Sequence, residues 1–236
     1  MNRNRTPIVV AAVVVVVLVI GLVVVLATRG DDDGDDAATP AAGNTVADGT
    51  DGGAEDDAQL PAALEGELRP LTVEGEALPV FGDGDDEAIG QVAPVLTGES
   101  FDGEVVTTAA GGRPVMIVVL AHWCPHCNNE IPRLVELNDS ERLPQDLRVV
   151  GVSTAVSPDA PNFPPSEWLA EKDWPFEAIA DYVDFDDGTY LASDALGVSG
   201  FPFVVIVDGD GEVVTRWSGE SDVDELQERI ADAVSG

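Results

Sequence analysis

Basic side chains are scarce in this chain of 236 residues. It has 11 lysines and arginines against 45 aspartates and glutamates, its single lysine is Lys172, and its formal net charge is −34. Without a basic cluster the surface cannot displace counterions from phosphates, which argues against nucleic acid as a partner. A large net charge of one sign also keeps proteins soluble and apart, so we expect a monomer.

Cysteine is nearly absent as well. The chain contains only Cys124 and Cys127, together with two histidines. A secreted scaffold held by disulfides carries several spaced cysteines. A four-ligand zinc site would need more cysteine and histidine than these four residues comfortably supply. One Cys-x-x-Cys with no other cysteine therefore indicates chemistry rather than architecture, and we expect no metal and no cofactor.

The N-terminus carries a long apolar run. Residues 8–27 are uncharged, and about 20 helical residues span a hydrocarbon core of ~30 Å. The alternative is a cleaved signal peptide, whose apolar part is typically about 7–15 residues and ends in an A-x-A-like site. We predict a short cytoplasmic segment (1–7) and a transmembrane anchor (8–28). Because Arg3 and Arg5 precede the run, the rest of the chain is expected outside the cytoplasm.

Acidic and small residues dominate the next segment. Residues 29–67 are rich in Asp, Gly, Ala and Thr, with strong self-repulsion and few large apolar side chains, which predicts a disordered linker. Calcium binding by its acidic run is the alternative. Apolar residues then return, and we place one domain at residues 68–236, beginning with an N-terminal β extension.

The domain shows alternating strand and helix patterns, which predicts an α/β fold with a mixed sheet. A central insertion covers residues 155–177, and Ser166 is the expected N-cap of its helix. Gly197 ends a later helix, and a Gly-Asp-Gly turn joins the last two strands. The predicted strands are 105–108, 114–121, 147–153, 176–180, 203–208 and 212–218, and the predicted helices are 125–137, 166–172, 189–196 and 222–234.

Residues 123–127 (WCPHC) follow a buried strand and open a helix. Cys124 then lies at the helix N-terminus, where unpaired N–H groups and the macrodipole favour a thiolate. The spacing of Cys124 and Cys127 on a first helical turn brings the sulfurs close enough to bond. Pro125 stiffens this turn without removing a needed N–H. The motif predicts thiol–disulfide exchange.

These residues resemble the thioredoxin superfamily, and their surroundings resemble its TlpA/ResA branch. The similar segments are residues 90–94 (GQVAP), 101–103 (FDG), 130–132 (EIP) and 190–217. The resemblance covers roughly residues 68–236. It implies a thioredoxin fold and a membrane-anchored thiol–disulfide oxidoreductase with Cys124 and Cys127 as the redox-active pair.

The resemblance also assigns roles to neighbouring residues. Pro202 would be a cis-proline facing the cysteines, with an ordinary trans proline as the alternative. Phe201, Trp123 and Pro125 would line the groove for substrate peptides, although Phe201 could instead be core. Glu130 would be a buried carboxyl that exchanges a proton with Cys127, with a solvated helix glutamate as the alternative.

His126 makes the motif Cys-Pro-His-Cys, which is also DsbA-type. An imidazole that donates to the Cys124 sulfur would stabilise the thiolate and make the disulfide a stronger oxidant. The branch is often reducing and serves cytochrome c maturation. We favour an oxidase or isomerase for exported cysteine-containing proteins, working with a membrane or extracytoplasmic redox partner, over such a reductase.

The rival from another class is a metal-carrying or adaptor protein without turnover, in which His122 would join the motif as a ligand. The aspartates that follow the insertion invite a calcium site but lack a full loop pattern, so we predict a solvated turn. They are Asp181, Asp184, Asp186 and Asp187.

Overall fold

The structure, a computed structural model, describes residues 60–235. The predicted cytoplasmic segment (1–7), the anchor (8–28) and residues 29–59 of the linker lie outside the described residues. Within residues 60–235, no helix is long and apolar enough to cross a membrane.

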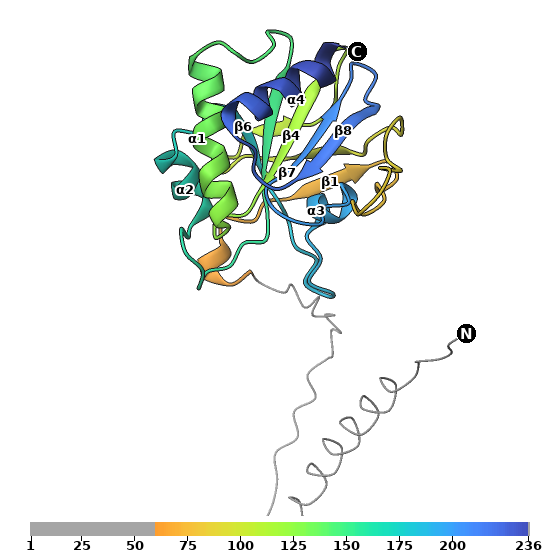
Figure 1. Cartoon of the computed structure of the whole chain (residues 1–236). Coiled ribbons are helices and arrows are strands. Elements are labelled where there is room, and N and C mark those ends of the chain that lie inside the picture. Colours follow the sequence, from red (N-terminus) through yellow and green to blue (C-terminus); the bar gives the residue numbers. More distant parts are fainter. Residues whose placement is uncertain (1–59, 236) are drawn as a thin grey trace, which may run out of the picture. The chain divides into compact units, whose positions relative to one another are not determined.

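A five-stranded mixed sheet forms the centre of the domain, in the order β6-β5-β4-β7-β8 (Figure 1). Its strands are β4 (Val115–Leu120), β5 (Arg148–Ser153), β6 (Glu177–Ala180), β7 (Phe203–Val207) and β8 (Val213–Ser218). Strand β4 runs parallel to β5 and antiparallel to β7, and all six of its residues are buried. A continuous apolar run of this kind is what a strand covered on both faces requires. The predicted mixed-sheet α/β fold is confirmed.

Two helices cover one face of this sheet. They are α1 (Pro125–Asp139) and α4 (Val223–Ser235), which lie against each other. Ile131 and Leu134 of α1 and Leu226 of α4 share a buried cluster with the side chains of β4 that point to this face. Because α1 starts directly after β4, the apolar stripe of the helix fixes the motif 123–127 at the end of the central strand.

The other face is covered by α3 (Leu191–Ala195) and by a second sheet. This sheet is antiparallel and consists of β1 (Leu71–Glu74), β2 (Val95–Glu99) and β3 (Val105–Thr107). The predicted β extension is therefore present, and it also takes in residues 105–107, which we had assigned to the main domain. A Cβ at Gly98 would lie 2.8 Å from Cγ2 of Ile179, so glycine lets β2 approach the main sheet closely.

The folded part begins before residue 68, where the sequence analysis placed its boundary. The 3-10 turn η1 (Ala62–Leu64) precedes Glu67, whose buried carboxylate accepts hydrogen bonds from Ser166 N (2.9 Å) and Oγ (2.6 Å). Ser166 is accordingly not the N-cap that we expected. It lies inside the first turn of α2 (Pro165–Glu171) and binds Glu67 instead. Residues 60–67 thus pack on the central insertion.

The predicted solvated turn is wrong for Asp181, which is fully buried. Its carboxylate accepts hydrogen bonds from Thr154 Oγ1 (2.7 Å), Ala192 N (2.9 Å) and Tyr182 N (2.8 Å). Burial raises the pKa of this carboxyl, and the three donors oppose the rise. Asp181 therefore joins the ends of β5 and β6 to α3, while Asp184, Asp186 and Asp187 are exposed.

Candidate active site

The two cysteines lie at the start of α1. Cys124 is the N-cap residue with an extended backbone, and Pro125 is the first helical residue. No disulfide bond joins Cys124 and Cys127 in this structure. Cys124 keeps 5% of its surface exposed, whereas Cys127 is fully buried. Both cysteines are buried, and the more exposed of the two is Cys124, at the helix N-terminus, where a thiolate is best stabilised.

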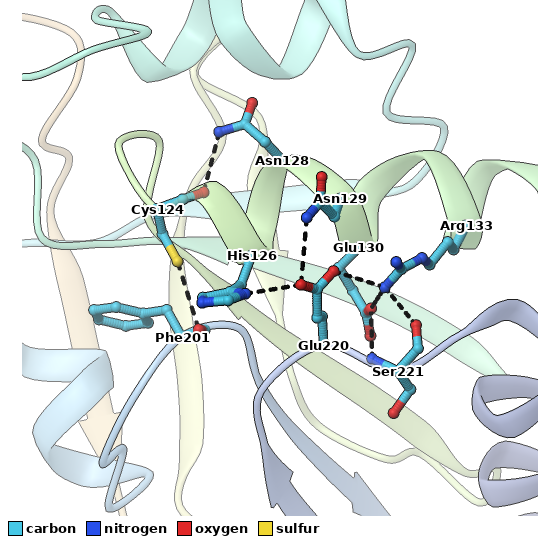
Figure 2. Close-up of polar contacts among 9 residues, drawn as sticks. All are labelled: Cys124, His126, Asn128, Asn129, Glu130, Arg133, Phe201, Glu220 and Ser221. Carbon is cyan, nitrogen blue, oxygen red and sulfur yellow. Dashed lines mark hydrogen bonds and ion pairs between the residues drawn. The ribbon is translucent and has the colours of Figure 1, made fainter.

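A backbone carbonyl faces the accessible thiol. The Cys124 Sγ donates to the carbonyl oxygen of Phe201 at 3.5 Å (Figure 2). The Phe201–Pro202 peptide bond is cis, in agreement with the resemblance, and Pro202 is buried. The structure thus brings Cys124 and the segment before β7 together, although 77 positions separate Cys124 from Phe201.

Aromatic and apolar side chains surround this contact. Trp123 is 37% exposed, and its ring lies 5.9 Å from the Phe201 ring in an edge-to-face arrangement. The indole Nε1 of Trp123 donates to the carbonyl oxygen of Ala155 (2.8 Å), at the start of the insertion. Pro125 is exposed and Phe201 half-buried. We refer to Trp123, Pro125 and Phe201 as the apolar rim, a surface that suits contact with a peptide.

Glu130 is fully buried, so it is not a solvated helix glutamate. Its Oε2 accepts the Ser221 N–H (3.1 Å) and lies 3.5 Å from Nη1 of Arg133. Its Oε1 has no hydrogen-bond partner among the described residues. Burial raises the pKa of Glu130 to about 7, against the opposing effects of the Ser221 N–H and of Arg133. A carboxyl in this range can both give and take a proton near neutral pH.

Cys127 has an environment that disfavours its thiolate. Burial raises the pKa of this thiol, and the nearby Cys124 and Glu130 raise it further, whereas a hydrogen bond with the backbone of Ala121 lowers it. Cys127 therefore stays protonated unless a neighbouring group removes its proton. Glu130, three residues further along the same helix, is close enough to raise the pKa of the Cys127 thiol.

His126 has a different partner from the one that we predicted. Its side chain is 62% exposed, and its Nδ1 lies 2.8 Å from Oε1 of Glu220. Glu220 also accepts a bond from Asn129 Nδ2 (3.3 Å), and its Oε2 receives Nη1 of Arg133 (2.8 Å). The pKa of Glu220 is lowered, first by the bond from His126. Among the described residues His126 makes no hydrogen bond to Cys124; its bond is to Glu220 instead.

His122, the extra ligand of the metal-carrying alternative, is engaged elsewhere. Its Nε2 accepts the Ser157 N–H (3.1 Å), so in the neutral ring Nδ1 carries the proton and donates to the carbonyl oxygen of Pro161 (2.8 Å). Burial lowers the pKa of this imidazole. Within residues 60–235 no group of three or more His, Cys, Asp or Glu is arranged to hold a metal ion.

Two charged residues of the site escaped the sequence analysis. Arg133 stands three residues after Glu130, a spacing that predicts contact on one helix face, so it could have been found. Glu220 lies 94 positions after His126, and no local pattern marks it.

The chain is similar to a known family and to several known proteins. The AhpC/TSA family model matches residues 89–229. Among curated proteins, the thiol:disulfide interchange protein HelX of Rhodobacter capsulatus is 27% identical over 150 residues, which cover 62% of this chain and 77% of HelX. The thiol:disulfide interchange protein DsbE of Escherichia coli is 30% identical over 129 residues, which cover 52% of this chain and 57% of DsbE.

Solved structures are similar as well. The crystal structure of StoA from Bacillus subtilis superposes with a TM-score of 0.46 at 17% identity, and covers 60% of this chain and 97% of its own. The thioredoxin domain of the thiol-disulfide oxidoreductase BVU-2223 from Bacteroides vulgatus gives a TM-score of 0.48 at 24% identity. The match covers 62% of this chain and 98% of that domain's chain.

Proposed function

The chain belongs to the AhpC/TSA family, and from that premise we propose that it is an extracytoplasmic thiol–disulfide oxidoreductase that exchanges disulfides with exported cysteine-containing proteins. The observation that carries the proposal is the dithiol at the start of α1. There the Cys124 thiol, at the helix N-terminus, is held 3.5 Å from the carbonyl oxygen that precedes the cis Pro202. The names of HelX and DsbE, both thiol:disulfide interchange proteins, support the same chemistry.

The reaction in the oxidising direction begins from the Cys124–Cys127 disulfide. A substrate thiolate attacks the Cys124 sulfur, which forms a mixed disulfide and expels Cys127 as a thiolate. Glu130, with a pKa of about 7, gives this thiolate its proton. A second substrate thiolate then attacks the substrate sulfur of the mixed disulfide, which leaves an oxidised substrate and releases Cys124. The dithiol is reoxidised by a membrane or extracytoplasmic redox partner.

The direction of exchange is a finer proposal. We favour an oxidase or isomerase because His126 places an imidazole in the turn that carries Cys124. The alternative is a reductase for cytochrome c maturation. The bond of His126 to Glu220 rather than to Cys124 supports this alternative, because an imidazole that does not bind the Cys124 sulfur does not stabilise its thiolate. The reduction potential of the couple decides between them, since thioredoxin lies at about −270 mV and DsbA at about −120 mV.

Location and partner choice complete the proposal. We propose that residues 8–28 anchor the chain in the cell membrane with residues 1–7 in the cytoplasm, and that the domain acts as a monomer outside. A reporter enzyme fused after residue 236 should then be active only outside the cytoplasm. The insertion 155–177 contacts Trp123 and His122 through Ala155, Ser157 and Pro161, which makes it the candidate for partner specificity.

Turnover of a model disulfide substrate tests the activity. With a disulfide substrate the exchange runs in the reducing direction, in which the Cys124 thiolate attacks and Cys127 resolves the mixed disulfide. C124S should therefore abolish turnover, because it removes the attacking thiolate, and C127S should stop the reaction at the mixed disulfide. Equal activity in both variants and the wild type would refute the proposal. Stoichiometric copper or zinc in the purified chain, without exchange activity, would establish the metal-carrying alternative instead.

A further inference from the structure

Glu220 stands in the short loop between β8 and α4, and that loop is tied to the active site at two points. The Gly219 N–H donates to the carbonyl oxygen of Pro202 at 2.9 Å. Gly219 has a φ of +93°, a backbone conformation that residues other than glycine rarely adopt. On the other side of Glu220, the Ser221 N–H donates to Glu130. The backbone therefore holds Glu220 between the cis-proline segment and the buried acid.

The carboxylate of Glu220 divides its two oxygens between the imidazole of His126 and the guanidinium of Arg133 (Figure 2). Its Oε1 lies 2.8 Å from Nδ1 of His126, and its Oε2 lies 2.8 Å from Nη1 of Arg133. The same Nη1 atom donates to the Ser221 carbonyl (2.5 Å) and lies 3.5 Å from Oε2 of Glu130. Arg133 thus has its short carboxylate contact with Glu220 and its long one with Glu130.

We propose that Glu220 is a positioning residue that couples His126, in the turn of the accessible cysteine, to the buried Glu130 through the guanidinium of Arg133. The inference rests on the proposed dithiol exchange, because the coupling matters only if Cys124 and Cys127 react in turn. His126 lies in the turn that carries Cys124 and Glu130 lies near Cys127, and Glu220 with Arg133 is the link between them.

The coupling works by competition for one cation. While the Glu220 carboxylate holds Arg133, Glu130 receives only a weak contact and keeps its proton more readily. The His126 ring, 2.8 Å from Oε1 of Glu220, competes with Arg133 for the same carboxylate, which leaves more of the Arg133 interaction for Glu130. The contact of His126 with Glu220 therefore favours loss of the proton from Glu130.

The charges around Glu130 are few, which makes the coupling measurable. Arg133 from α1 lowers the pKa of Glu130, and Glu220 from the loop raises it. The thiol of Cys127 is the titratable group on which Glu130 acts in turn. Because Oε1 of Glu130 has no partner among the described residues, it is the oxygen on which the proton can reside without breaking the bond from Ser221.

Carboxyl NMR of the full-length chain, labelled with carbon-13 in glutamate, tests the coupling. E220Q removes the competing anion, so the pKa of Glu130 should fall by on the order of one unit. D222N is the matched control, since Asp222 is an exposed acid of the same loop whose hydrogen bond is to Glu225. It should leave the titration of Glu130 unchanged. An equal shift in E220Q and D222N, or none in E220Q, would overturn the inference.

A double-mutant cycle gives the second arm. H126A changes an exposed side chain and should raise the pKa of Glu130, because Glu220 then interacts more fully with Arg133. In the E220Q background H126A should have no effect, since the link is already broken. The same H126A shift in both backgrounds, or no shift in either, would show that His126 and Glu130 are independent. The titrations need no turnover, so the two proposals can be refuted separately. The coupling can be absent while Cys124 still exchanges disulfides, and exchange can be absent while the coupling is observed.

Discussion

Replacing Glu130 by glutamine removes a fully buried carboxyl whose pKa rises from 4.5 to about 7 on folding. Glutamine keeps the shape of the side chain, and its carbonyl oxygen can still accept the Ser221 N–H. Its amide group takes the place of Oε1, which has no partner among the described residues. E130Q therefore lowers the free energy of unfolding by a pH-independent amount, through altered packing and hydrogen bonding. It also raises this free energy by an amount that depends on pH.

The pH-dependent part follows from proton linkage. A carboxyl with a raised pKa binds its proton more tightly in the folded state, so its contribution to stability is full below pH 4.5 and is lost as the pH rises through about 7. Each pKa unit corresponds to about 1.4 kcal/mol, so ionised Glu130 costs on the order of 3 kcal/mol. E130Q lacks this cost, and its free energy of unfolding should gain about 3 kcal/mol relative to the wild type between pH 4 and 8.

Equilibrium urea unfolding of the reduced protein, followed by tryptophan fluorescence, measures this difference. Groups that titrate equally in both proteins cancel when the two curves are subtracted. E136Q is the matched control, because it makes the same change at an exposed position of α1, and its difference from the wild type should be flat. A flat difference for E130Q as well would refute the assignment of Glu130 as a carboxyl that ionises near neutral pH.

Two further predictions concern His126 and the N-terminal extension. If the protein is an oxidant because the His126 imidazole stabilises the Cys124 thiolate, H126A should make the Cys124–Cys127 couple more reducing by a few tens of millivolts. A potential difference of ~30 mV corresponds to ~1.4 kcal/mol, about the strength of one charge-assisted hydrogen bond. A wild-type potential near that of thioredoxin and no shift in H126A would favour the reductase. D86A should destabilise the domain by about 3–5 kcal/mol in thermal or urea unfolding, because it leaves the buried guanidinium of Arg216 without its carboxylate. A loss below about 1 kcal/mol would show that this ion pair does not hold the extension.

Local patterns in the sequence were sufficient for the central elements. The apolar run 114–121 predicted β4 because a strand buried on both faces needs apolar residues at every position. The helical pattern of residues 125–137 predicted α1, in which Ile131, Leu134 and Leu137 are buried. Since the motif 123–127 lies between these two elements, its placement at a helix N-terminus followed from the same patterns.

Contacts between distant segments could not be predicted in this way. The partner of His126 is 94 positions away, so the sequence suggested the nearest sulfur and missed Glu220. Asp181 looked like part of an acidic turn because Asp184, Asp186 and Asp187 follow it in the sequence. Only the fold supplies the three donors that allow its burial. Ser166 is of a residue type that often caps helices, yet its N–H and hydroxyl donate to the carboxylate of Glu67, 99 positions earlier. A resemblance supplied the role of Glu130, and its surroundings required the structure.

We propose that Cys124 forms the mixed disulfide with substrate in both directions of the exchange. Cys127 is expelled when a substrate is oxidised, and it resolves the mixed disulfide when a disulfide substrate is reduced. The most direct test is to react C124S and C127S separately with a model disulfide, quench with acid, and map the adduct by mass spectrometry. We expect a mixed disulfide on Cys124 in C127S, and little or none on the fully buried Cys127 in C124S. Adducts at equal rates on both cysteines, or only on Cys127, would contradict it.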